Sequence, residues 1–183
     1  MKKENSERPI VLAIGGSDSA GLAGLQRDNT SILALSGHAM NVVTANTAQN
    51  AQGVVAINPV EGPAFCSQLD AALASSVQAI KTGLLASPAQ LTSIASAYMQ
   101  RQEKPPLVID PVLAASSGES FSDGALIDSL VKQLLPLAIL ITPNISEAER
   151  LCGQKITSCA TLVRAAQALK SLGAKAVLIK GGH

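Results

Sequence analysis

The segment IVLAIGGSDSAGLAGLQRD, Ile10 to Asp28, joins a short apolar run, a glycine-rich loop and the start of an amphipathic pattern. The apolar run over residues 10–14 predicts a buried strand, and Leu25 opens a helical pattern that continues to Leu35. Because glycine has no side chain, a glycine-rich turn between a strand and a helix lets a ligand approach backbone N–H groups. The segment indicates a ligand loop at the carboxyl end of a first strand, although an ordinary tight turn has the same composition.

The spacing of the glycines excludes two familiar nucleotide-binding loops. A P-loop has the pattern G-x-x-x-x-G-K-S/T, and Gly16 and Gly21 are spaced for it, but Leu22 stands where the lysine belongs. A dinucleotide-binding loop has the pattern G-x-G-x-x-G, which the glycines of this segment do not follow. The loop therefore predicts a ligand-binding site, but its sequence does not identify the ligand.

The composition fits one globular domain in the cytoplasm. The 183 residues are 47% hydrophobic, which is enough for a sizeable core. Fourteen basic residues against 13 acidic ones, with 2% aromatic residues, argue against a nucleic-acid partner. The first apolar run ends at Gly15, too early for a signal peptide, and the apolar runs are too short for a membrane helix. Three cysteines without a C-x-x-C pair indicate neither a disulfide framework nor a zinc site, so we expect reduced, buried thiols.

Strand and helix patterns alternate along the chain. The expected strands are Ile10–Ile14, Met40–Ala45, Val77–Lys81, Leu107–Asp110, Ala138–Thr142 and Ala176–Lys180. The expected helices are Leu22–Leu35, Pro63–Ser75, Pro88–Arg101, Asp123–Leu134, Ser146–Leu151 and Cys159–Leu172. Such alternation predicts an α/β fold with a mostly parallel sheet covered on both faces. Residues 1–8 are expected to form a flexible tail, and residues 9–183 a single domain.

Polar groups and glycines follow each of the six expected strands. The residues at or directly after the strand ends are G-G-S-D at 15–18, N-T-A-Q-N at 46–50, K-T-G at 81–83, D-P at 110–111, T-P-N at 142–144 and K-G-G at 180–182. Loops favour these residue types in general, so one such segment is weak evidence. In an open α/β sheet, however, the carboxyl ends of parallel strands form the ligand-binding edge. The six together predict a binding site there.

Four residues near this edge suit a phosphate and a divalent metal ion. Carboxylate and amide oxygens of Asp110, Asn144 and Glu147 are ligands that Mg²⁺ takes directly or through water, and Lys180 offsets phosphate charge. Each residue also has a plain structural interpretation. Asn144 and Glu147 have the spacing of a helix capping box, Asp110 before proline ends a strand, and Lys180 fits a solvated edge. In the same way, Asp28 fits an exposed helix carboxylate.

Six motifs in order resemble a known family. They are G-G-S-D-S-A-G-L-A-G-L-Q-R-D (15–28), T-A-Q-N (47–50), K-T-G-L-L (81–85), V-I-D-P-V (108–112) with S-S-G (116–118), I-T-P-N-I-S-E-A (141–148) and I-K-G-G-H (179–183). Together they are similar to hydroxymethylpyrimidine/phosphomethylpyrimidine kinase of thiamine biosynthesis, in the ribokinase-like superfamily. The resemblance implies a three-layer αβα fold with a mostly parallel central sheet. It also implies ATP-dependent phosphorylation of 4-amino-5-hydroxymethyl-2-methylpyrimidine and its monophosphate, with Mg²⁺, in a homodimer without nucleic-acid or membrane partners.

The resemblance assigns roles to individual residues. Asp28 and Gln49 match residues that read the pyrimidine ring, the backbone at Gly16 lines the pocket, and Leu84 and Val112 match positions that pack on the substrate. A carboxylate and an amide suit the adjacent donor and acceptor groups of an aminopyrimidine. Gln49 also fits a residue that only satisfies loop backbone. The residues expected to bind ATP and its phosphates are Asp110, Asn144, Glu147 and Lys180. Mg²⁺ is expected near Glu147 and Asp110, bound in part through water molecules.

The chain departs from the family pattern at three places. Leu22 stands where the family usually has a second consecutive glycine, and Leu84 where it often has methionine. The family continues past K-G-G-H to a loop of G-T-G followed by Cys or Asp, which supplies the anion hole, whereas this sequence ends at His183. We therefore expect a C-terminally incomplete fold with no catalytic residue in this chain and at most trace activity. A pyridoxal kinase-like enzyme and an inactive pyrimidine-binding module are the alternatives.

Overall fold

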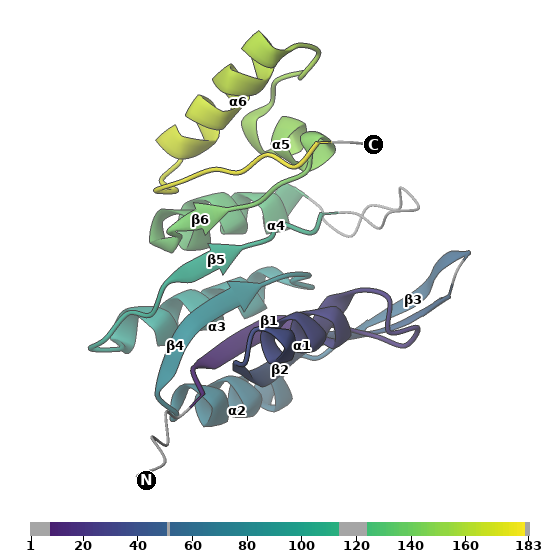
Figure 1. Cartoon of the computed structure of the whole chain (residues 1–183), viewed down its shortest axis with the longest axis vertical. Helices are drawn as coiled ribbons and strands as arrows, with labels where there is room; N and C mark the ends of the chain where they lie inside the picture. The colour runs from purple at the N-terminus through teal and green to yellow at the C-terminus, as the bar shows by residue number, and fades with distance from the viewer. Residues whose placement is uncertain (1–7, 51, 114–123, 182–183) are drawn as a thin grey trace, which may run out of the picture.

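A six-stranded sheet forms the centre of the protein (Figure 1). The computed structural model describes residues 8–50, 52–113 and 124–181. The strands are β1 (Ile10–Asp18), β2 (His38–Asn50), β3 (Gly53–Pro59), β4 (Val77–Thr82), β5 (Leu107–Ile109) and β6 (Leu140–Ile141). Their order is β3-β2-β1-β4-β5-β6, and every neighbouring pair is parallel except β2 with β3. The predicted α/β class with a mostly parallel sheet is confirmed.

Helices cover the two faces of the sheet unequally. The helices are α1 (Gly24–Ala34), α2 (Gly62–Leu73), α3 (Pro88–Gln100), α4 (Gly124–Ser129), α5 (Ile145–Cys152) and α6 (Cys159–Ser171). α1 packs on β1 and β2 from one face, while α2, α3 and α4 lie on the other (Figure 1). The core between sheet and helices is aliphatic, with Leu12, Ile14, Leu91 and Ile109 fully buried. Burial of these side chains is the main force that holds the layers together.

On the face of the sheet that carries α1, helices cover β5 and β6 less than they cover β1 and β2. Side chains alternate between the faces of a strand, so Val108 on β5 and Leu140 on β6 point away from the buried Ile109 and Ile141. Both are half-buried, and Leu178, beside β6, is 56% exposed. Within the described residues this part of the sheet has little helical cover.

Helix ends follow local chemistry that the sequence predicts. The Ser87 side chain accepts a hydrogen bond from the Gln90 N–H at the start of α3, and Pro88 follows it. A serine cap with proline at the first position is a common helix start, because proline lacks an N–H that the first turn leaves free. α6 ends at Ser171, shortly before Gly173. These two predictions are confirmed.

The first two strands are longer than predicted, and one strand was missed. β1 runs through the expected loop at 15–18 with a register shift at Gly15/Gly16, and β2 includes the T-A-Q-N motif. β3 pairs antiparallel with β2. β3 carries the apolar run Val54 to Ile57, but Val55, Ala56 and Asn58 are exposed, because β3 is the edge strand of the sheet. The hairpin of β2 and β3 therefore depends on backbone pairing more than on burial.

Three other expectations are wrong in detail. Residues 176–180 form isolated parallel bridges, Ile141 with Val177 and Asn144 with Lys180, in place of a full strand. The fourth helix changes to a π-helical turn at Leu130–Leu134 and a 3-10 turn at Leu135–Leu137, where Pro136 interrupts the α-helical hydrogen bonds. The thiols are free as expected, but Cys66 and Cys159 are exposed. Residues 1–7, the S-S-G motif and the last two residues lie outside the described residues.

Among the described helices, none has the length and apolar character that crossing a membrane requires.

Candidate active site

The glycine segment brings β1, the residues that follow β4 and the start of α1 into close contact. Gly16 lies against Leu84, because a Cβ atom on Gly16 would come within 2.9 Å of Leu84 Cδ2. Gly24, the first residue of α1, has a φ of +56° and lies against the carbonyl oxygen of Gly16. A side chain at either position would displace its neighbour. The floor of the site is therefore made by glycine backbone, with Leu84 beside it, as expected for a surface on which a flat ring packs.

The carboxylate of Asp18 organises the loop between β1 and α1. Its oxygens accept hydrogen bonds from the N–H groups of Ala20 at 2.7 Å, Leu22 at 2.8 Å and Ala23 at 2.7 Å. Burial of Asp18 acts to raise its pKa, but hydrogen bonds from the Gln49 side chain and from these three N–H groups outweigh it, so the pKa lies below the ordinary 3.8. The Leu22 side chain is 68% exposed. Leu22 is thus held through its backbone, and its side chain does not fill the floor of the site.

Gln49, on β2, joins the hairpin to this loop. Its backbone N–H donates to Ser19 Oγ at 2.9 Å, and the Ser19 hydroxyl donates to the Gln49 carbonyl oxygen at 3.1 Å. Its side-chain amide hydrogen-bonds to the Asp18 carboxylate. The structure places Gln49 at the edge of the site, bound to the glycine loop.

Asp28, on α1, is paired with Lys81 on β4. Lys81 Nζ lies 3.0 Å from Oδ1 and 2.8 Å from Oδ2 of Asp28. The two side chains are 26% and 21% exposed. The interpretation of Asp28 as an exposed, solvated helix carboxylate is therefore wrong. The sequence places Lys81 among the polar residues at a strand end, but its pairing with Asp28, 53 residues away in the chain, was not predicted.

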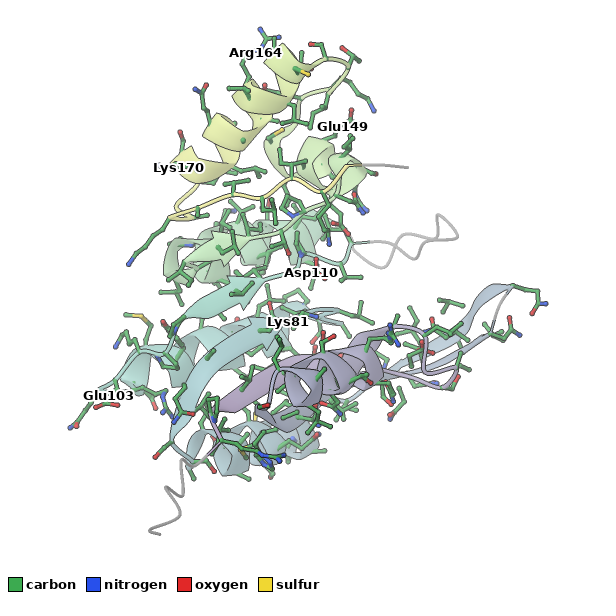
Figure 2. All side chains as sticks on the ribbon, viewed as in Figure 1. Lys81, Glu103, Asp110, Glu149, Arg164 and Lys170 are labelled. Carbon is green, nitrogen blue, oxygen red and sulfur yellow. The ribbon has the colours of Figure 1, made fainter. Side chains whose placement is uncertain are left out.

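A second group of polar residues gathers at the ends of β5 and β6. Lys180 Nζ lies 2.7 Å from Asp110 Oδ1, and the Thr142 hydroxyl is 3.3 Å from the same oxygen. Asp110 follows β5, as Figure 2 shows, and Lys180 reaches it from the segment paired with Asn144. The Lys180 side chain is 45% exposed, as the interpretation of a solvated edge lysine expects, and its ammonium is also engaged by the Asp110 carboxylate.

The start of α5 completes this second group. Asn144 Oδ1 accepts from the Glu147 N–H and the Asn144 N–H donates to Glu147 Oε2, both at 2.8 Å, so the capping box is formed. Burial raises the pKa of Glu147, and the nearby charge of Asp110 raises it further. Hydrogen bonds from the N–H groups of Asn144 and Leu113, together with the charge of Lys180, lower the pKa but do not cancel the rise. The pKa of Glu147 thus depends on the charges of both Asp110 and Lys180. Asn144 and Glu147 therefore cap α5 and at the same time lie close to the ion pair of Asp110 and Lys180.

A shallow, mainly apolar pocket lies beside Asp110 of the second group. Its lining includes Thr82, Gly83, Asp110 and Val112 together with leucine side chains of α3 and α4. The Thr82 hydroxyl is buried and has no hydrogen-bond partner within the described residues. Val112 lines this pocket, two residues after Asp110 in the chain. The predicted site residues thus form two groups at the carboxyl ends of the strands, and Val112 lies with the second.

The donor set fits Mg²⁺ only as an ion shared with phosphate. The described residues contain no group of three or more His, Cys, Asp or Glu side chains that could hold a metal ion. The two carboxylates near the second group, Asp110 and Glu147, are engaged by Lys180 and by the helix cap. Mg²⁺ is commonly held by one or two carboxylates, several waters and the phosphates of a substrate, so two carboxylates suffice for that mode.

The architecture is that of a ribokinase-like fold, and comparison with solved structures supports this class. Phosphomethylpyrimidine kinase from Clostridium difficile matches with a TM-score of 0.88 and 37% identity over 96% of this chain and 76% of that one. A pyridoxal kinase from Staphylococcus aureus, in complex with pyridoxal, matches with a TM-score of 0.87 and 32% identity over 96% of this chain and 65% of that one.

The sequence comparisons give the family. The profile of the phosphomethylpyrimidine kinase family matches residues 18–183, and the chain belongs to this family. The hydroxymethylpyrimidine/phosphomethylpyrimidine kinase of Mycobacterium tuberculosis is 42% identical over 176 residues, which cover 96% of this chain and 64% of that protein. A thiamine biosynthesis bifunctional protein of Geobacter sulfurreducens is 41% identical over 96% of this chain and 36% of its own length. The chain therefore spans less than two thirds of these relatives.

Proposed function

We propose that the first group of residues binds 4-amino-5-hydroxymethyl-2-methylpyrimidine and its monophosphate, as part of a kinase of thiamine diphosphate biosynthesis. The observation that carries this proposal is the convergence of Gly16, Asp28, Gln49 and Leu84, from four separate segments, at one edge of the sheet. Glycine backbone and an aliphatic side chain suit the faces of a ring. Carboxylate and amide oxygens suit its amino group.

The second group is proposed to bind the phosphates of ATP. Lys180 supplies positive charge, and Asp110 and Glu147 supply carboxylates for a magnesium ion bound to those phosphates. Phosphoryl transfer depends mainly on positioning and charge neutralisation, which are the tasks these residues can perform. We assign to these 183 residues the pyrimidine site and part of the phosphate site. The homodimer and the cytoplasmic location remain predictions.

Calorimetric titration of the purified chain tests the proposed substrate. We expect the hydroxymethylpyrimidine to bind with a dissociation constant at least tenfold lower than that of pyridoxal. Pyridoxal lacks the amino group from which Asp28 and Gln49 are proposed to accept hydrogen bonds. The pyridoxal kinase alternative has one observation in its favour, the structural match to the Staphylococcus aureus enzyme. Tighter binding of pyridoxal than of the pyrimidine would select that alternative.

Replacing Glu147 with glutamine tests the second group. The amide keeps an acceptor for the Asn144 N–H and removes the charge, so we expect a melting temperature within a few degrees of the parent at pH 7 and weaker binding of Mg²⁺-ATP. Because the pKa of Glu147 is raised in the fold, its contribution to stability is greatest at low pH and is lost as the pH rises through that pKa. The stability of the variant should lack this pH dependence in thermal melts.

The opposite pattern would contradict the phosphate role. A large loss of melting temperature, with Mg²⁺-ATP binding unchanged, would leave Glu147 with a capping role alone. Glu149→Gln, on the same helix but bonded to Lys155 and the Ile156 N–H, serves as the matched control. It changes the same charge on α5 without touching the capping box.

A further inference from the structure

Lys81 occupies a position where a lysine is unexpected. It lies on β4, a strand flanked by β1 and β5, in register with Ala13 on one side and Val108 on the other. Interior strands of a parallel sheet are normally apolar on both faces, because an ammonium group loses hydration there. A lysine is stable at such a place when an anion is fixed beside it.

The ammonium of Lys81 has that anion in Asp28. It contacts both carboxylate oxygens, at 3.0 and 2.8 Å, across a separation of 53 residues in the chain. Within the described residues, each of the two side chains has the other as its hydrogen-bond partner. Gly83 leaves the space the ammonium needs, since a Cβ atom there would lie 3.0 Å from Nζ. Figure 2 shows Lys81 on β4 beside α1.

The pair presents a different surface from that of a lone carboxylate. Its net charge is zero, and the carboxylate keeps acceptor capacity, because two of its roughly four acceptor positions are used by Lys81. A neutral ring with an amino group can donate to it without bringing a countercharge. A cationic ring gains less, because Lys81 already neutralises Asp28 and repels a second positive charge.

We infer that Lys81 is a positioning residue that fixes the Asp28 carboxylate and cancels its charge, so that the site selects neutral amino-heterocycles over cationic ones. This inference rests on the proposed function of Asp28 as a ring-binding group. It adds a specificity role for a residue that only the tertiary structure brings to the ring site. Lys81 acts on the ligand through Asp28 and through its charge.

The test compares two ligands, the neutral hydroxymethylpyrimidine and its N-methylpyrimidinium cation, by calorimetry. Lys81→Met should weaken binding of the neutral ligand about tenfold and raise the ratio of cation affinity to neutral affinity about tenfold, because the charge of Asp28 becomes uncompensated. The N-methyl group of the cation adds the same bulk in every variant, so its steric effect cancels when the ratio of cation affinity to neutral affinity is compared between variants. Lys81→Arg keeps the charge and should leave the ratio within about threefold of the parent.

Two further variants make the test independent of the folding of Lys81→Met. Gly83→Ala leaves both charged residues intact and shifts the ammonium by a few tenths of an ångström, so the ratio should rise in the same direction by a smaller factor. Lys132→Met removes a lysine from an exposed ion pair with Asp128 and should change neither affinity. Thermal melts confirm that each variant is folded.

The outcomes separate this inference from the proposed function. If Asp28→Asn weakens the neutral ligand while folded Lys81→Met and Gly83→Ala leave the ratio unchanged, the inference is overturned and the pyrimidine site stands. Equal loss of both ligands in Lys81→Met and Gly83→Ala also overturns it, since it shows support of structure alone. If the unaltered chain binds no pyrimidine, the proposed function falls, and this inference falls with it.

Discussion

Replacing Asp28 with alanine is expected to weaken binding of the hydroxymethylpyrimidine by at least about 30-fold, equivalent to about 2 kcal/mol. The variant removes the proposed acceptor for the ring amino group. It also leaves Lys81, with 26% of its side chain exposed, facing the ligand without its anion. Both effects act against a neutral amino-heterocycle, because an unpaired cation near the ring must keep its own hydration.

Calorimetry on the purified chain measures this effect, and circular dichroism melts establish that the variant is folded. Asp128→Ala is the matched control, since it removes an aspartate that also pairs with a lysine but lies on the surface, 68% exposed. The control should bind like the parent. Unchanged affinity in a folded Asp28→Ala variant would remove Asp28 from the ring site.

Replacing Gly24 with alanine is expected to cost about 3 kcal/mol of unfolding free energy and to disrupt the pyrimidine site. A φ of +56° disfavours any side chain, at a cost of about 1–2 kcal/mol. In addition, the new Cβ would overlap the carbonyl oxygen of Gly16, which is backbone inside a buried strand and cannot move cheaply. Relief of the overlap would shift the floor on which the ring is proposed to pack.

Gly62 offers a close control for this prediction. It is also the first residue of a helix and has a φ of +58°, but a Cβ atom there would meet nothing within 4 Å. Gly62→Ala should therefore cost only about 1 kcal/mol and leave pyrimidine affinity unchanged. Urea unfolding of both variants compares the losses. Equal losses would show that contact with Gly16 contributes nothing.

The chemistry of the second group was easier to predict from sequence than that of the first. Asn144 and Glu147 lie three residues apart, so their capping contact follows from helix geometry alone. Asp110 and Lys180 lie 70 residues apart in the chain, yet both stand at the ends of expected strands, and parallel strands place their carboxyl ends together. The sequence therefore predicted the approximate place of this group, although it did not predict the ion pair.

The amino-acid sequence by itself determined the α/β class, most of the order of strands and helices along the chain, the family, and the edge of the sheet where the candidate site residues gather. These properties follow from local periodicity, from caps and from short motifs, all of which are readable within a few residues. The tertiary structure decided that β3 pairs as an edge strand, that Asp18 holds the glycine loop, and that Asp28 is neutralised by Lys81. Asp28 meets Lys81 only because β4 lies beside β1 and α1 covers that part of the sheet. Contacts of this kind depend on strand order and register across the whole sheet, which no local pattern encodes.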